Sequence, residues 1–154
     1  MRSLALSQIW TQSCPAYLFF ATEIGSNHLF KNQVAIGMLQ SITQVPCLIG
    51  DQIRTPPIQK TICERIAQAT LVIADISNEK LNTCIEAGIA RGAERDLFLV
   101  AIEPRKKPPF IFRDMQVWFY SNDLELLGIL YRIAYPYRRR VLNHELELKE
   151  ERSF

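Results

Sequence analysis

The chain has 154 residues, of which 48% are hydrophobic and 22% charged, and its formal net charge is +2. This length suits one domain with a substantial core, and the near-neutral charge gives no global signal for nucleic-acid binding. No apolar run is long enough to span a bilayer, and the N-terminus lacks the sustained hydrophobic segment of a signal peptide. We therefore expect a cytoplasmic protein without a membrane or nucleic-acid partner.

Short apolar runs alternate with helical patterns along the chain. The runs predict strands near residues 16–21, 45–49, 71–76, 97–102 and 115–120, and the helical patterns cover about 29–42, 56–69, 81–94 and 123–135. Either Ser121 or Asn122 is expected to cap the last of these helices. This order predicts an α/β fold, a doubly wound, mostly parallel five-stranded sheet with helices on both faces.

The C-terminal tail differs from the rest in composition. Residues 1–136 form the expected domain, whereas residues 137–154 carry three consecutive arginines followed by several glutamates and leucines. The tail is interpreted as a charged helix, as an arm that packs on a neighbouring subunit, or as a solvated terminus with a frayed end.

The four cysteines are scattered without a CxxC pair. They are Cys14, Cys47, Cys63 and Cys84, and the last three lie in apolar or helical patterns. This favours reduced, packed thiols over a disulfide framework or a zinc site, so no metal is expected.

The stretch from Leu71 to Gly92 carries the chemistry. Its apolar run ends in Asp75 and is followed by a polar loop and by a helix beginning near Asn82. That helix carries one acid, Glu86, among small and apolar neighbours. Because ligands of open α/β sheets bind beyond the carboxyl ends of the strands, Glu86 is a candidate catalytic group.

The candidate binding residues surround the ends of the first and third strands. They are Phe20, Gly25, Ser26, Asp75, Ser77, Asn78 and Asn82. A strand-end aromatic such as Phe20 can stack on a base, although the phenylalanines of this strand are mostly core candidates. The Gly25-Ser26 segment lies where a phosphate loop would lie, but a single glycine is more typical of an ordinary turn.

Each polar candidate also has a structural interpretation. Asp75 can cap the turn that follows its strand, and Asn82 can be a helix N-cap while still lining a pocket. Glu86 can pair with Arg91 or Lys80 across a helical turn. These alternatives remain open at the level of the sequence.

The same residues resemble a known group of proteins. The matching positions are Ile66, Ala67, 69–77, Asn78, Asn82, Glu86, Gly88, Ala90, Pro109, Phe110 and Tyr120. This pattern, which spans about Tyr17 to Tyr135, is similar to the TIR-like, nucleotide-binding proteins related to nucleoside 2-deoxyribosyltransferases, which are often found in bacterial defence systems.

The resemblance implies a flavodoxin-like sheet with a nucleotide or nucleoside pocket. Enzymes of the group use the helix glutamate, here Glu86, to cleave or exchange an N-glycosidic bond, as in NAD hydrolysis. Two positions depart from the pattern: Lys80 replaces the aspartate of the deoxyribosyltransferases, and Ala87 replaces a common leucine. The departure at Lys80 weakens a deoxyribosyl-transfer interpretation specifically.

The chemistry can also be argued from the residues. Cleavage of a ribosyl N-glycosidic bond passes through an oxocarbenium-like state, which a carboxylate stabilises or attacks. Asp75 and Asn82 can bind the ribose hydroxyls, and the amides that begin the Asn82 helix can hold a phosphate.

Two functions therefore remain. The first is a nucleotide N-glycosidase that uses Glu86 on NAD or a related nucleotide, and the alternative is a nucleotide-binding sensor or signalling module without turnover. Both use the nucleotide as substrate or ligand with no separate cofactor. The resemblance also implies a homo-oligomer.

Overall fold

The computed structural model describes residues 16–23, 29–50, 58–77, 81–103 and 112–152. Its elements are β1 (Leu18–Ala21), α2 (Leu29–Thr43), β2 (Cys47–Leu48), α3 (Ile58–Gln68), β3 (Leu71–Asp75), α4 (Leu81–Gly92), β4 (Asp96–Ile102), β5 (Val117–Tyr120) and α5 (Asp123–Arg152). All five expected strands are present, and the four helices begin within two residues of their expected starts.

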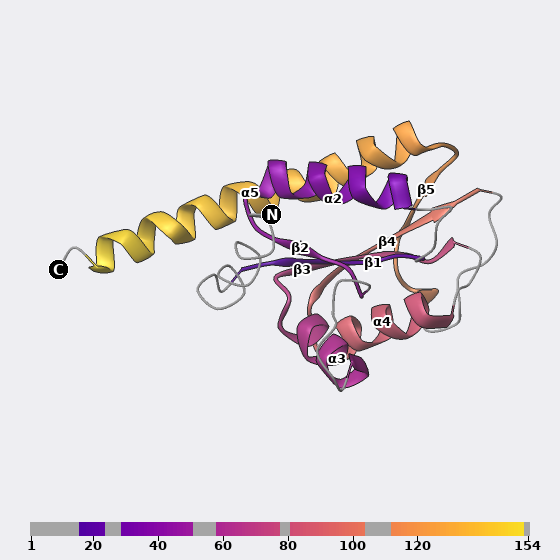
Figure 1. Cartoon of the computed structure of the whole chain (residues 1–154), viewed down its shortest axis with the longest axis horizontal. Coiled ribbons are helices and arrows are strands. Elements are labelled where there is room, and N and C mark those ends of the chain that lie inside the picture. The colour runs from indigo at the N-terminus through magenta and orange to yellow at the C-terminus, as the bar shows by residue number, and fades with distance from the viewer. Residues whose placement is uncertain (1–15, 24–28, 51–57, 78–80, 104–111, 153–154) are drawn as a thin grey trace.

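The strands form one sheet in the order β2-β1-β3-β4-β5, and every neighbouring pair is parallel. Helices α2 and α5 cover one face, and α3 and α4 cover the other (Figure 1). The predicted doubly wound fold is thereby confirmed. The strand order reverses between β1 and β3, which is where ligands bind in sheets of this kind.

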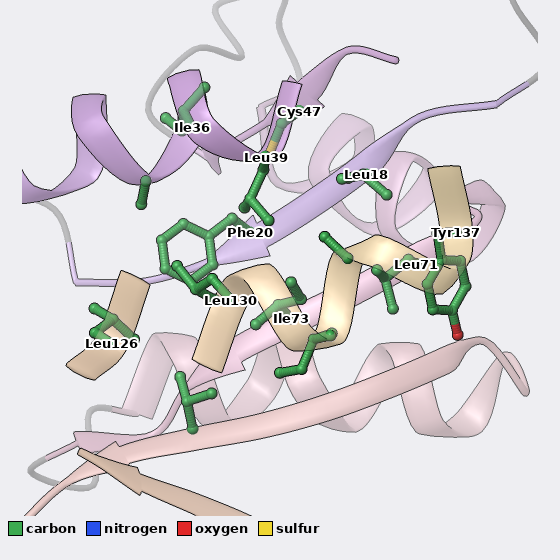
Figure 2. Close-up of a cluster of buried hydrophobic side chains, with 14 of the residues drawn as sticks. Leu18, Phe20, Ile36, Leu39, Cys47, Leu71, Ile73, Leu126, Leu130 and Tyr137 are labelled. Carbon is green, nitrogen blue, oxygen red and sulfur yellow. The ribbon is translucent and has the colours of Figure 1, made fainter. Parts of the chain in front are cut away.

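Two hydrophobic clusters hold the layers together, one on each face of the sheet. Alternate residues of β1 point to opposite sides, so Leu18 and Phe20 join one cluster while Phe19 and Ala21 join the other. Figure 2 shows Phe20 among Leu39 of α2, Leu130 of α5 and Ile73 of β3. Every residue of β1 and β3 is buried, which explains their apolar runs, whereas β4 and β5 are buried only in part.

Helix α5 departs from its expected end. Its N-terminal cap is Asn122, whose side-chain oxygen accepts a hydrogen bond from the Glu125 amide at 2.9 Å. The helix continues through Pro136 to Arg152 and extends away from the sheet (Figure 1). The expected end near Tyr135 is therefore wrong, because the residues after Pro136 continue the helix although proline cannot donate its backbone hydrogen bond.

The thiols are only partly as expected. Cys47, Cys63 and Cys84 are free, and burial raises the pKa of Cys47 to about 12. Cys63 lies on the exposed side of α3, so the expectation of a packed thiol is wrong there. Cys14 lies outside the described residues.

Among the described residues no group of three or more His, Cys, Asp or Glu side chains is arranged to hold a metal ion. Within these ranges, none of the helices combines the length and apolar character of a membrane span.

Candidate functional site

Asp75 ends β3 and is only 4% exposed. One carboxylate oxygen accepts a hydrogen bond from the Tyr120 hydroxyl at 2.6 Å. The other accepts the Ser77 amide at 3.1 Å and a short hydrogen bond from the Ser77 hydroxyl. The turn-capping role considered for Asp75 is therefore present, and it is combined with a contact to a strand 45 residues further along the chain.

Ser77 extends this network to a third strand. Its hydroxyl oxygen accepts a hydrogen bond from the Ile102 amide at 2.8 Å and lies 3.3 Å from the Tyr120 hydroxyl. Because Ile102 ends β4 and Tyr120 ends β5, the network joins the carboxyl ends of β3, β4 and β5. Burial, and then the adjacent Asp75 carboxylate, raise the pKa of Tyr120, so its hydroxyl stays a donor.

Replacing Tyr120 by Phe tests this network. We expect Tyr120→Phe to lower the free energy of unfolding by about 1.5 to 3 kcal/mol, since a buried hydrogen bond to a charged group is lost. Urea unfolding measures the effect, with Tyr135→Phe, on the exposed side of α5, as the control. Equal stabilities of the two variants would show that the network contributes nothing.

Glu86 is the sixth residue of α4. Thr83, Ala87 and Ala90 form the buried side of this helix, and Glu86 lies beside it, half-buried. Desolvation raises the pKa of Glu86 from 4.5 to about 7, as its small and apolar neighbours suggested. Ala87, one of the two departures from the pattern described above, is fully buried.

The contacts of Arg91 on one flank of α4 show which way Glu86, on the other flank, faces. Arg91 forms a two-pronged ion pair with Asp114, with N–O distances of 2.8 and 2.6 Å. Asp114 lies just before β5, so Arg91 marks the flank that faces β5. At 3.6 residues per turn, Glu86 lies on the other side of the buried stripe, towards β1 and α3, both of which contact α4. This is the flank nearest the switch point.

Pairing of Glu86 with Arg91 is thus replaced by the Arg91–Asp114 pair. Lys80, the other suggested partner, lies outside the described residues. The burial of Glu86 comes from its position beside the helix–sheet contact.

The raised pKa of Glu86 predicts how the free energy of unfolding changes with pH. Ionisation is disfavoured in the folded state, so the contribution of Glu86 is fully present below pH 4.5 and is lost as pH rises to about 7. We expect Glu86→Gln to be more stable than wild type by about 3 kcal/mol above this window and equally stable below it. Urea unfolding of both proteins across the window measures the difference. A constant difference would contradict the assignment.

The other expected site residues have different outcomes. Phe20 is fully buried in the core beneath α2 and α5, so the structure gives it a packing role rather than a ligand contact. Asn82 is exposed and is the second residue of α4. The N-cap position precedes Leu81, so the N-cap interpretation of Asn82 is wrong. Gly25, Ser26 and Asn78 lie outside the described residues.

The sequence reasoning missed two buried polar residues, Thr22 directly after β1 and Asn32 in α2. Thr22 and Asn32 are both buried, and the Thr22 hydroxyl donates to the Asn32 side-chain oxygen at 3.4 Å. The Asn32 amide donates to the Glu23 carbonyl at 3.0 Å, which ties α2 to the exit of β1. In the sequence, the only indication was that Asn32 is a polar residue within the apolar helical pattern of 29–42.

These groups meet at the edge of the sheet from opposite sides. Ile73 belongs to the core beneath α2 and α5, so Asp75, two residues later, points to the same face, as does Tyr120. Glu86 belongs to the layer of α3 and α4 on the other face. A ligand that contacts both carboxylates must therefore lie beyond the carboxyl edge of the sheet.

No family model matches the sequence, and no curated protein is similar to it. Solved structures do match. The CMP N-glycosidase of Clostridium botulinum has a TM-score of 0.60 at 18% identity, over 74% of this chain and 96% of that one. A 2-deoxyribosyltransferase from Leishmania mexicana has a TM-score of 0.58 at 18% identity, over 75% and 97%.

A third match is the 2-deoxyribosyltransferase of Bacillus psychrosaccharolyticus, with a TM-score of 0.55 at 12% identity, over 73% of this chain and 90% of that one. The chain has the flavodoxin-like fold of these deoxyribosyltransferase-like proteins. The similarity supports the deoxyribosyltransferase part of the resemblance, whereas the TIR-like part gains no support from these structures.

Proposed function

We propose that the protein cleaves the N-glycosidic bond of a nucleotide or nucleoside, with Glu86 as its catalytic carboxylate. The observation that carries this proposal is the half-buried Glu86 side chain in the second turn of α4, and helix periodicity puts it on the flank towards β1 and α3. The shared fold with a CMP N-glycosidase and two deoxyribosyltransferases supports the same class of bond.

The chemistry requires an ionised Glu86. As the C–N bond breaks, positive charge develops on the ribose ring, and the carboxylate either stabilises that charge or bonds to the anomeric carbon. Water then supplies the hydroxyl of the freed sugar. Its proton goes to the departing base when that base leaves as an anion, and to solvent when nicotinamide leaves as a neutral molecule. With a pKa of about 7, the carboxylate is about half ionised at neutral pH, and a cationic substrate would lower that pKa and favour the ionised form.

NAD is our first candidate substrate, because its nicotinamide is a positively charged and good leaving group that needs no general acid. A pyrimidine nucleotide is the second, because the matched glycosidase acts on CMP. Both place a ribose next to Glu86 and a phosphate at the strand ends, where the first amides of α4 can bind it.

The alternative is nucleotide binding without turnover. Its support is that Asp75 uses its carboxylate oxygens to accept hydrogen bonds from Tyr120 and Ser77, which is a structural role. The replacement of the family aspartate by Lys80 points in the same direction.

The test is incubation of the full chain at high concentration with NAD, with CMP and with 2-deoxynucleosides. Mass spectrometry detects released nicotinamide or free base, and calorimetry detects binding. We expect base release from at least one of them. Binding without any base release would favour the sensor or signalling module.

A further inference from the structure

One face of α5 is apolar, and none of the described residues covers it. Leu124, Tyr131 and Tyr135 are 79%, 49% and 55% exposed, and the exposed Gly128 lies between them. The spacings of four, three and four residues place these side chains in one line along the helix. We call these four residues the α5 stripe. The rings of Tyr131 and Tyr135 stack with centroids 5.7 Å apart, so the aromatic end of the stripe is already ordered.

The glycine in the stripe has no explanation within the described chain. A Cβ atom added at Gly128 would meet nothing within 4 Å, so no neighbouring side chain of the described residues requires its absence. Glycine in the middle of a helix is less favourable than any residue except proline. A second molecule that approaches the helix closely at this point would account for it.

We propose that the α5 stripe is the docking surface for a second copy of this chain, with the two α5 helices antiparallel about a twofold axis. The stripe is then symmetric about its own centre. Leu124 lies opposite Tyr135 of the partner subunit, and Gly128 lies opposite Tyr131 of the partner subunit. A bulky ring thus meets the smallest residue twice across one self-complementary contact.

The charges beside the stripe favour the same arrangement. Asp123 and Glu125 lie at the start of α5, Arg132 and Arg138 lie further along, and all four are exposed. At 3.6 residues per turn, Glu125 and Arg132 lie on one flank of the stripe, and Asp123 and Arg138 lie on the other.

The twofold axis keeps each flank beside the same flank of the partner while reversing the direction of the helix. Glu125 therefore comes within about 3 Å, measured along the helix axis, of the level of Arg132 of the partner subunit. Asp123 has the same offset from Arg138 of the partner subunit. Opposite charges meet on both flanks, whereas a parallel pair would place like charges together, so charge selects a second copy in the antiparallel orientation.

The test compares two glycines by sedimentation of the full chain. Gly128→Gln places a side chain in the stripe, whereas Gly37→Gln does the same on α2, where the glycine is equally exposed and free of neighbours within 4 Å. We expect wild type and Gly37→Gln to dimerise alike, and Gly128→Gln to weaken the dimer about tenfold or more. Both substitutions should raise the melting temperature of the monomer to a similar extent, because glutamine is a better helix residue than glycine.

A second variant tests the charges separately. Arg132→Glu combined with Arg138→Glu makes both flanks acidic along their whole length and should also yield monomers, with an unchanged circular dichroism spectrum. A wild type that stays monomeric at high micromolar concentration would overturn the proposal. A folded Gly128→Gln variant that dimerises as wild type does would overturn it as well.

Discussion

Glu86→Gln should slow turnover by about a hundredfold or more while nucleotide binding survives. The amide keeps the shape of the side chain but removes the negative charge that the oxocarbenium-like state requires. Because Glu86 is half-buried beside the packed side of α4, few water molecules can replace that charge. The measurements are kcat on the substrate identified by the nucleotide panel and Kd by calorimetry.

The matched control is Glu64→Gln on the neighbouring helix α3. Glu64 is an exposed acid whose carboxylate lies 3.9 Å from the Lys60 ammonium, so its replacement should leave kcat unchanged. If Glu86→Gln retains the wild-type kcat, the reacting carboxylate lies elsewhere. If it loses binding and turnover together, Glu86 acts in positioning the ligand.

Phe20→Ala should lower the free energy of unfolding by about 3 to 5 kcal/mol. The ring is fully buried among side chains of α2, α5 and β3, so its removal leaves a cavity beneath both helices (Figure 2). Denaturant unfolding gives the stability, and nucleotide affinity should be unchanged at temperatures where the variant is folded.

Phe20→Leu is the comparison for this core position. It keeps most of the volume and should cost less than about 1.5 kcal/mol. If Phe20→Ala instead had near-normal stability and weakened nucleotide affinity, Phe20 would contact the ligand, and its packing role in the core would be contradicted.

The elements of the fold were predictable because their signals are local. The runs at 71–74 and 97–102 are apolar throughout, as is typical of parallel strands packed between two helix layers, and the structure has β3 and β4 there. An unbroken apolar run does not, however, show to which face of the sheet each side chain points. A run without alternation does not indicate which face Phe20 or Phe19 takes, and for that reason Phe20 was assigned to the ligand.

The site was predictable only in part. Glu86 and Asp75 could be chosen as candidates because each follows from a strand or helix pattern within one segment. The partnership of Asp75 with Tyr120 joins residues far apart in sequence, and no local pattern encodes it. The end of α5 was missed because Pro136 ordinarily stops a helix, whereas here the turns on both sides continue it.

The parallel sheet also has a consequence for folding. The strand pair that frames the switch point, β1 with β3, aligns Leu18 with Leu71, so a long loop must close before the two strands meet. Such high contact order predicts slow folding and late formation of this pair. The proposed nucleotide site lies beyond the ends of these two strands, so a bound nucleotide would stabilise only forms in which the pair has already formed. Refolding followed through ligand binding would therefore report the last long-range contact of the chain rather than its early helices.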